Sequence, residues 1–263
     1  MLAFIFSTGR NGGGFVKSVL SSVGVSCCHE RRPRILRLFN NTQNTFLRKI
    51  GYKLIKSDLK RVNKKNSVQI EHNCMIPTFV DNIVKDFPDS IFIHQIRDPR
   101  DWVKSAINRS MTNSVRRFFT VSLPCWVSRP NKYSLGSDPV SKMFEMQVLN
   151  WVNSNKIYSG LKNKTDKYFL LKYEDLGKDS LSFIKRIMEI CGLSEFFKEE
   201  ILKESINRAS RNESRKFIGS WETWDEKYII FLYNHCKDLM EEHGYGKEEE
   251  WQRKINNLFN YEK

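Results

Sequence analysis

The sequence lacks the features that mark membrane, zinc-binding and secreted proteins. No run of 18 apolar residues occurs in the 263-residue chain, so we expect no membrane-spanning helix. The six cysteines form no CxxC pair and no cysteine–histidine pattern with zinc-ligand spacing, so we expect reduced thiols and no metal site. The apolar start, residues 1–6, is too short for a secretory signal and has no basic segment before it. These absences predict a cytoplasmic protein.

Negative charge is also scarce. The chain has 44 Lys and Arg against 30 Asp and Glu, a net charge of +14. Such an excess suits an anionic partner: nucleic acid, a phosphate-rich cofactor, an acidic glycan or an anionic membrane. Basic and aromatic residues do not interleave, so we expect no specific nucleic-acid binding.

Short apolar runs recur at the length of β-strands, with helical patterns between them. Continuous rather than alternating hydrophobicity is typical of parallel strands covered on both faces. We therefore predict an α/β fold of three layers, α/β/α, like that of P-loop NTPases, with a mostly parallel central sheet of about five strands. The predicted strands are residues 2–6, 25–28, 68–71, 91–96 and 168–172.

No internal repeat or low-complexity linker divides the chain. We predict one domain spanning residues 1–263. Residues 109–140 form the least regular stretch, rich in proline and serine, and we interpret them as a loop or lid over a site. Residues 247–263 have the pattern of a charged amphipathic helix, which we expect to be a solvated flank.

A glycine-rich segment, FSTGRNGGGFVKSVL at residues 6–20, follows the first predicted strand. A turn of this kind directs backbone N–H groups and the positive end of a helix dipole at an anion. The segment is no Walker A loop, because Gly14 is followed by Phe15 and the nearest Lys-Ser pair, at Lys17, comes too late. Arg10 is the cation that the loop offers instead.

A second anion clamp is predicted in HQIRDPRDWVKSAINR, residues 94–109. Arg97 ends the fourth predicted strand, Asp98 caps a helix, and Pro99 begins it. Ser105 follows the cap by seven residues and therefore lies about 20° from its direction on the helix. Arg97 and Ser105 then face one ligand, such as a phosphate.

These two segments resemble motifs of sulfotransferases that use 3′-phosphoadenosine 5′-phosphosulfate (PAPS). Residues 10–14 resemble the loop [KR]-[ST]-G-[ST]-x, which binds the 5′-phosphosulfate in that family, and residues 97–105 match R-D-P-R-D-x-x-x-S, which binds the 3′-phosphate. The segments 170–179, 217–224 and 239–246 resemble further family patterns in the expected order.

The resemblance implies an enzyme that moves a sulfuryl group from PAPS to a hydroxyl or amine, in line and without a metal. It implies that Arg10 and the loop N–H groups stabilise charge on the departing phosphate. The residues that it implies for the donor are Arg10, Asn11, Gly12, Gly13, Gly14, Phe15, Arg97, Ser105, Tyr173, Arg215 and Lys216.

The third predicted strand supplies two candidates for the general base. The resemblance places Glu71 where many carbohydrate sulfotransferases have a catalytic Glu, and His72 departs from the lysine that follows it. The alternative is that Glu71 pairs with Arg97 or Arg10 and only orders the donor site.

The loop departs from the family at Gly13, which replaces a Ser or Thr that commonly supplies a hydroxyl. Anion binding then depends more on the backbone and Arg10, and we expect slower catalysis. His29 and Glu30 follow the second predicted strand and are candidates for contact with the acceptor or, alternatively, a local helix cap.

A sugar hydroxyl on an anionic glycan is the acceptor class that we favour, with a lipid, a small metabolite or a peptide tyrosine as open alternatives. Trp126, Arg116, Arg117 and Arg129 of the predicted lid are candidates to line the acceptor site. Three other functions remain open on these residues. They are a diverged P-loop kinase or NTPase, which would depend on Mg²⁺, a polyanion-binding protein without catalysis, and a degenerate sulfotransferase that binds PAPS without turnover.

Overall fold

The computed structural model describes residues 1–30, 44–63, 68–73, 77–112, 133–209 and 217–260. The chain divides into two compact units, each of which we describe by itself. The first comprises Met1–Arg97 and Ile157–Asn212, and the second comprises Asp98–Lys156 and Glu213–Lys263. The interpretation of residues 1–263 as one domain stays a prediction.

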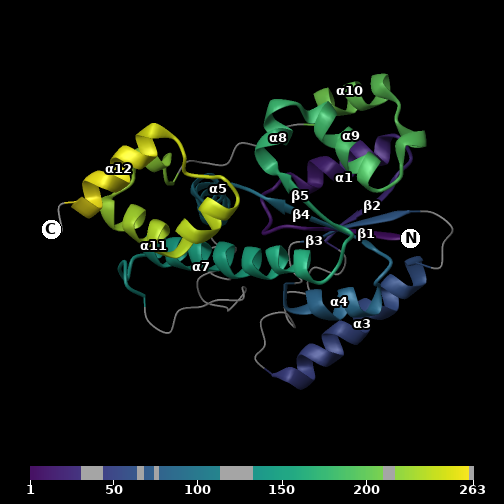
Figure 1. Ribbon diagram of the computed structural model, residues 1–263, viewed down its shortest axis with the longest axis horizontal. Helices are drawn as coiled ribbons and strands as arrows, with labels where there is room; N and C mark the ends of the chain where they lie inside the picture. The colour runs from purple at the N-terminus through teal and green to yellow at the C-terminus, as the bar shows by residue number, and fades with distance from the viewer. Residues whose placement is uncertain (31–43, 64–67, 74–76, 113–132, 210–216, 261–263) are drawn as a thin grey trace. The chain divides into compact units, whose positions relative to one another are not determined.

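The first unit is built on a parallel sheet of five strands in the order β2-β3-β1-β4-β5 (Figure 1). The α/β fold predicted from the sequence is confirmed. The strands are β1 (Leu2–Phe6), β2 (Ser26–His29), β3 (Gln69–Asn73), β4 (Ile91–Ile96) and β5 (Tyr168–Lys172).

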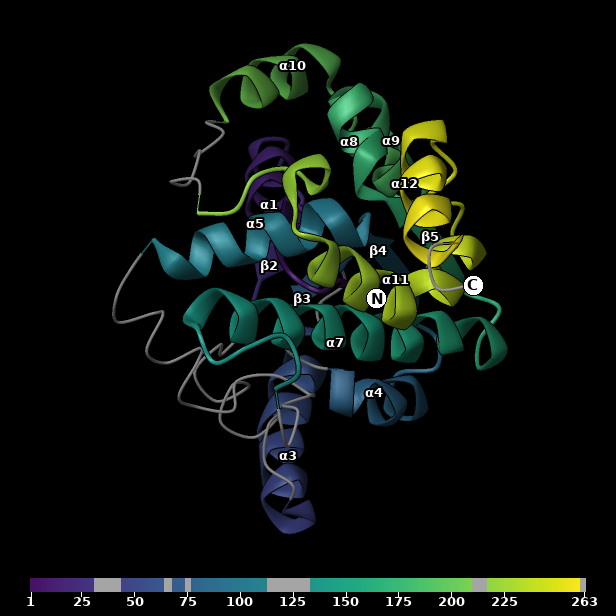
Figure 2. The ribbon, with the colours of Figure 1, turned by 90° about the vertical axis from the view of Figure 1, so that its left-hand side faces the viewer.

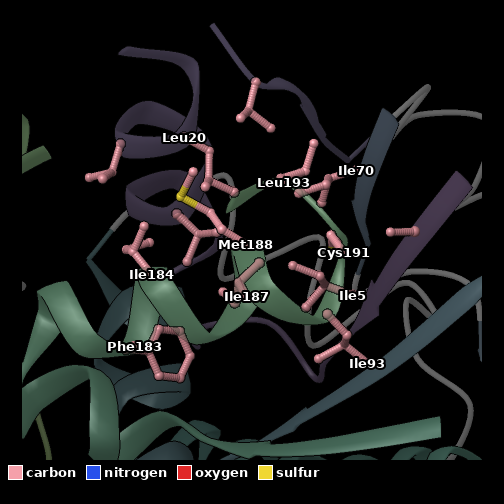
Figure 3. Packing of buried hydrophobic residues seen from close by; sticks show 14 of the residues in the cluster. Ile5, Leu20, Ile70, Ile93, Phe183, Ile184, Ile187, Met188, Cys191 and Leu193 are labelled. Atoms are coloured by element: carbon pink, nitrogen blue, oxygen red, sulfur yellow. The ribbon is translucent and has the colours of Figure 1, made fainter. Parts of the chain in front are cut away.

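One face of this sheet packs against α1 (Gly13–Ser22) and α9 (Ser180–Ile190). Side chains alternate between the two faces of a strand, so Ala3 and Ile5 of β1 point to this side. Figure 3 shows Ile187 and Met188 of α9 among the strand and helix residues of this core. The same side carries α8 (Tyr173–Lys178), η3 (Ser194–Phe196) and α10 (Glu199–Arg208).

The other face packs against α3 (Thr45–Asn63), η1 (Pro77–Phe79) and α4 (Val80–Asp86), with η2 (Gly160–Asn163) at its margin. Figure 2 shows this layer on the side of the sheet away from α1. Phe4 of β1 points here and stacks on Phe92 of β4, with ring centroids 5.7 Å apart. The sheet is therefore covered on both faces, as continuous apolar strands predict.

The second unit is helical. It contains α5 (Pro99–Met111), α7 (Pro139–Ser159) through Lys156, η4 (Trp221–Thr223), α11 (Glu226–Glu242) and α12 (Glu249–Asn260). Aromatic side chains hold these segments together: Phe144 of α7 lies edge-on to Trp224, 5.0 Å between centroids, and 4.6 Å from the ring of Tyr228. In the described part of the chain, no helix is long and apolar enough to cross a membrane.

Three local expectations differ from the structure. β3 continues through Asn73, two residues beyond the predicted strand, because His72 and Asn73 still pair with β1. The helices α5 and α7 occupy both ends of the stretch 109–140 that we expected to be irregular. The charged C-terminal helix is no solvated flank, since Trp251 and Ile255 are buried.

Candidate active site

The glycine-rich loop runs from the end of β1 to the start of α1 and needs glycine at its last position. Gly12 precedes α1 with φ of +75°, and a Cβ there would lie 2.8 Å from a methyl carbon of Leu176. The first helical bond runs from the N–H of Val16 to the carbonyl of Gly12. The N–H groups of residues 13–15 therefore have no acceptor within the helix.

Asn11 fixes this loop to the neighbouring strand β4. Its Nδ2 donates to the backbone carbonyl of Gln95 at 2.9 Å, and Gln95 Nε2 donates to the backbone carbonyl of Asn11 at 2.8 Å. Both residues are buried. Asn11 stays a predicted donor-binding residue, and its side chain holds the loop in place. Gln95 was not predicted, and its only signal in the sequence is a polar residue within an apolar strand.

Arg97 joins three predicted donor-binding residues. Its Nη1 donates to the backbone carbonyl of Arg10 at 2.9 Å, and its guanidinium lies over the ring of Tyr173, 4.3 Å from the centroid. A Cβ on Gly12 would lie 3.3 Å from that same ring. Arg10 has φ of +54°, and its side chain is exposed. The structure thus brings Arg10, Gly12, Arg97 and Tyr173 together at the carboxyl end of the sheet.

The chemistry of this loop fits an anionic ligand. Two guanidinium groups and the N–H groups at the start of α1 supply positive charge and donors. The Oγ1 of Thr8 is buried and has no hydrogen-bond partner within the described residues. A buried hydroxyl without a partner is uncommon in proteins, and a ligand with acceptor oxygens would satisfy it.

Gly13 is the point of closest packing in the site. A Cβ at Gly13 would lie 2.5 Å from Nε2 of His29 and 2.8 Å from Cε1 of His72. The two imidazole rings meet edge to face with centroids 5.4 Å apart. A side chain at Gly13 would require these rings to move, and this crowding accounts for a glycine where the resemblance has Ser or Thr.

His72 is buried beneath the loop in its neutral form. Its Nε2 lies 3.2 Å from the hydroxyl oxygen of Ser7, at hydrogen-bond distance. Burial, assisted by the neighbouring His29, lowers the pKa of His72 to about 3. Burial also lowers the pKa of His29, which is only partly enclosed.

This burial predicts acid sensitivity. In the unfolded chain His72 is protonated below its usual pKa of 6.5, whereas in the folded chain it stays neutral until the pH falls to about 3. The stabilising contribution is therefore complete above pH 6.5 and is lost as the pH falls toward 3. His72→Gln should reduce the loss of unfolding free energy between pH 8 and pH 5 by about 2 kcal/mol. Denaturant unfolding at both pH values measures this loss of unfolding free energy, and a substitution of the exposed His235, His235→Gln, is the control. Equal losses in wild type and His72→Gln would contradict the prediction.

The two candidates for the general base point to opposite faces of the sheet. In the register of β3 with β1, Glu71 pairs with Phe4 and His72 pairs with Ile5. Glu71 therefore lies on the face covered by α3 and α4, and His72 lies on the face covered by α1. Both side chains are buried.

The second unit contains the rest of the R-D-P-R-D motif. Asp98 caps α5 as predicted, accepting the N–H of Arg100 at 2.8 Å. Arg100, 4% exposed, binds the carboxylates of Asp98 and Glu248 through Nη2 at 2.6 and 2.9 Å. Its guanidinium also lies 4.8 Å from the ring centroid of Trp251. No role for Arg100 was predicted from the sequence.

Ser105 lies on α5 and is partly exposed. One turn further along α5, Asn108 Oδ1 accepts the backbone N–H groups of Phe217 and Ile218 at 2.7 and 2.9 Å. Asn108 thereby holds the segment that follows the predicted phosphate ligands Arg215 and Lys216. Those two residues, and the candidate acceptor residues Arg116, Arg117, Trp126 and Arg129, lie outside the described residues.

The four cysteines among the described residues are free thiols. Burial, with a smaller contribution from Glu71, raises the pKa of Cys27 to about 12, so this thiol is neutral at physiological pH. Across those same parts of the chain, no group of three or more His, Cys, Asp or Glu residues has an arrangement that would hold a metal ion.

Comparison with known proteins identifies similarity to one group of enzymes. Residues 4–178 match the family model of the sulfotransferase domain. Among solved structures, a sulfotransferase from Alicyclobacillus acidocaldarius superimposes with a TM-score of 0.55 at 11% identity, covering 95% of this chain and 97% of that one. Mouse sulfotransferase SULT7A1 complexed with PAP superimposes with a TM-score of 0.54 at 12% identity, covering 97% and 88%. At these identities the superpositions show the fold alone. No curated protein sequence matches the chain.

Proposed function

The chain belongs to the sulfotransferase family, and on this basis we propose that it transfers a sulfuryl group from PAPS to a hydroxyl or amine of an acceptor. The observation that carries the proposal is the gathering of Arg10, Gly12, Arg97 and Tyr173 around the start of α1. Such a site offers two cations, open N–H groups and an aromatic ring to a nucleotide bearing two anionic groups.

We assign the two ends of the donor to different parts of the site. The N–H groups of residues 13–15 and the side chain of Arg10 bind the 5′-phosphosulfate. Arg97 binds the 3′-phosphate with Ser105, and Arg215 and Lys216 are further candidates for that phosphate. Tyr173, whose ring packs against the guanidinium of Arg97, contacts the adenine of the donor. The product nucleotide is adenosine 3′,5′-bisphosphate (PAP), the ligand of the mouse sulfotransferase structure.

Catalysis in this assignment depends on position and charge. The S–O bond to the phosphate breaks as the acceptor oxygen or nitrogen bonds to sulfur in line, and negative charge grows on the departing phosphate oxygen. Arg10 and the N–H groups at the start of α1 stabilise that charge. The acceptor must lose its proton to a base.

We propose Glu71 as this base. His72 is a poor proton acceptor at neutral pH, because burial holds its pKa near 3 and its Nε2 already interacts with Ser7. Its Cε1 also lies 2.8 Å from the place of a Cβ on Gly13, so the ring packs against the loop. Glu71 lies on the opposite face of β3, clear of this histidine cluster. His72 then supports the loop.

For the acceptor we propose a hydroxyl of an anionic glycan. The net charge of +14 supports this class, since a basic surface attracts an acidic chain. Transfer rates from PAPS to a carboxylated oligosaccharide and to its neutral counterpart, at low and high salt, test it. Faster transfer to the neutral sugar at both salt concentrations would exclude the anionic class.

PAP binding is the direct test of the donor assignment. At about 100 times its Kd, PAP should stabilise the protein by about 2.7 kcal/mol and raise Tm by about 5–10 °C. Arg97→Ala should abolish most of this shift. Arg186→Ala, which removes an exposed arginine of α9, should retain it. Differential scanning fluorimetry measures all three, and a shift with ATP and Mg²⁺ but not with PAP would refute the assignment.

A further inference from the structure

The imidazole of His29 occupies the place of the first side chain of α1. Gly13 is the first residue of that helix, and its missing Cβ would lie 2.5 Å from Nε2 and 2.6 Å from Cδ2 of His29. The ring edge that carries Nε2 therefore stands beside the open N–H groups of the first turn. The N–H groups of a first turn form an anion site, so a group in this place lies beside the anion that they bind.

His29 is placed to bind a ligand rather than to fill the core. It lies at the carboxyl end of β2 and is partly exposed, whereas His72 behind it is buried. Within the described residues, neither ring nitrogen of His29 has a hydrogen-bond partner. Lys17 of α1 and Glu30 are the charged groups near the ring, and His72 contacts it from β3.

The position of His72 beside Gly13 also indicates a ligand site. Its Cε1 is the atom nearest to the missing Cβ, and the adjacent Nδ1 is buried with no partner among the described residues. An unsatisfied imidazole nitrogen next to the loop is a second sign that the cluster is completed by a ligand. The N–H groups of α1 and two imidazole edges thus converge on one place.

We infer that His29 is a further donor-binding residue, whose Nε2–H donates a hydrogen bond to the 5′ anionic group held at the start of α1. The inference rests on the proposed function, because it takes that anion to be the phosphosulfate of PAPS or the 5′-phosphate of PAP. A neutral imidazole carries one N–H, and an acceptor oxygen beside Nε2 selects the tautomer with the proton there. His29 then supplies the donor that a glycine cannot.

Isothermal titration calorimetry with two nucleotides tests this role without turnover. PAP carries the 5′-phosphate, and adenosine 3′-monophosphate lacks it. His29→Ala should raise the Kd of PAP about 10- to 100-fold, the usual effect of losing a hydrogen bond to a charged group. The Kd of adenosine 3′-monophosphate should change less than about twofold. His29→Gln, which keeps an N–H donor, should restore most of the PAP affinity.

A paired substitution tests the position itself. Gly13→Ser alone should weaken PAP binding and lower Tm, because its Cβ collides with His29. In the double variant Gly13→Ser with His29→Ala, the two closest contacts are removed, Cε1 of His72 at 2.8 Å is the contact that remains, and a hydroxyl stands at the start of α1. We expect its Kd for PAP to return to within about fivefold of wild type. Gly160→Ser, at a glycine whose Cβ would meet nothing within 4 Å, is the matched control.

The outcomes separate this inference from the proposed function. If wild type binds PAP and His29→Ala, still folded by circular dichroism, binds it equally well, the inference is wrong and the donor assignment stands. Equal weakening of both nucleotides would also overturn it, since His29 would then act on the fold of the loop. If wild type binds neither nucleotide, the proposed function itself fails.

Discussion

Glu71→Gln should lower kcat by about 10²- to 10⁴-fold, the usual contribution of a general base, and leave the Kd for PAP within about threefold of wild type. The amide has nearly the shape of the carboxylate but accepts no proton. Glu71 points away from the side of β3 that supports the loop, so donor binding should persist. Single-turnover transfer from labelled PAPS, with PAP titration in parallel, separates the two quantities.

His72→Gln decides between the two candidates for the base. If His72 supports the loop, its substitution should cost stability and less than about tenfold in kcat. Glu189→Gln, an exposed acid on α9, is the control for the change of acid to amide. A large loss of kcat in His72→Gln together with a small one in Glu71→Gln would reverse the assignment. Equal, modest losses would mean that neither residue takes the proton.

Arg100→Ala should destabilise the second unit by about 3–5 kcal/mol, the usual cost of removing one partner of a buried ion pair. Three groups lose a contact at once, and two of them, Asp98 and Trp251, are buried. The carboxylate of Asp98 loses its guanidinium, and the rings of Trp221 and Trp251 lose the cation that lies within 5.3 and 4.8 Å of their centroids. Because Glu248 precedes α12, the attachment of that helix to α5 should weaken as well.

Denaturant unfolding, followed by the fluorescence of the tryptophans, measures this effect. Lys104→Ala on the same helix removes an exposed pair with Asp101 and should cost less than about 1 kcal/mol. Tm should fall by about 6–20 °C in Arg100→Ala, given about 2–4 °C per kcal/mol for a chain of this size. A fall no larger than that of Lys104→Ala would show that the cluster does not stabilise the unit.

Strand positions were predictable because their signal is local. Leu2–Phe6, Ile91–Ile96 and Tyr168–Lys172 begin and end where the apolar runs do. The cap at Asp98 was equally local, since proline at the first helical position and an acid before it define a helix start. β3 was predicted too short, because its last residues are polar and belong to the sheet only through their pairing with β1 and β2.

Contacts between residues far apart in the chain could not be predicted from the sequence. The sequence does not show why residue 13 is a glycine. The reason is that the rings of His29 and His72 occupy the space of a side chain there. The separation of Glu71 from His72 was hidden for a similar reason, since adjacent residues alternate in direction only if the strand continues through both. Arg100 resembled a surface arginine because its partner Glu248 stands 148 residues away.

The paired hydrogen bonds between Asn11 and Gln95 bear on the cost of binding. A glycine-rich loop has many accessible conformations, and a ligand that must order it loses affinity to that conformational entropy. Here the two amide side chains, exchanging bonds with each other's backbone, restrict the loop in the absence of any nucleotide. The conformational entropy of the loop is therefore lost during folding rather than on binding, and the anion binds to donors that are already in position.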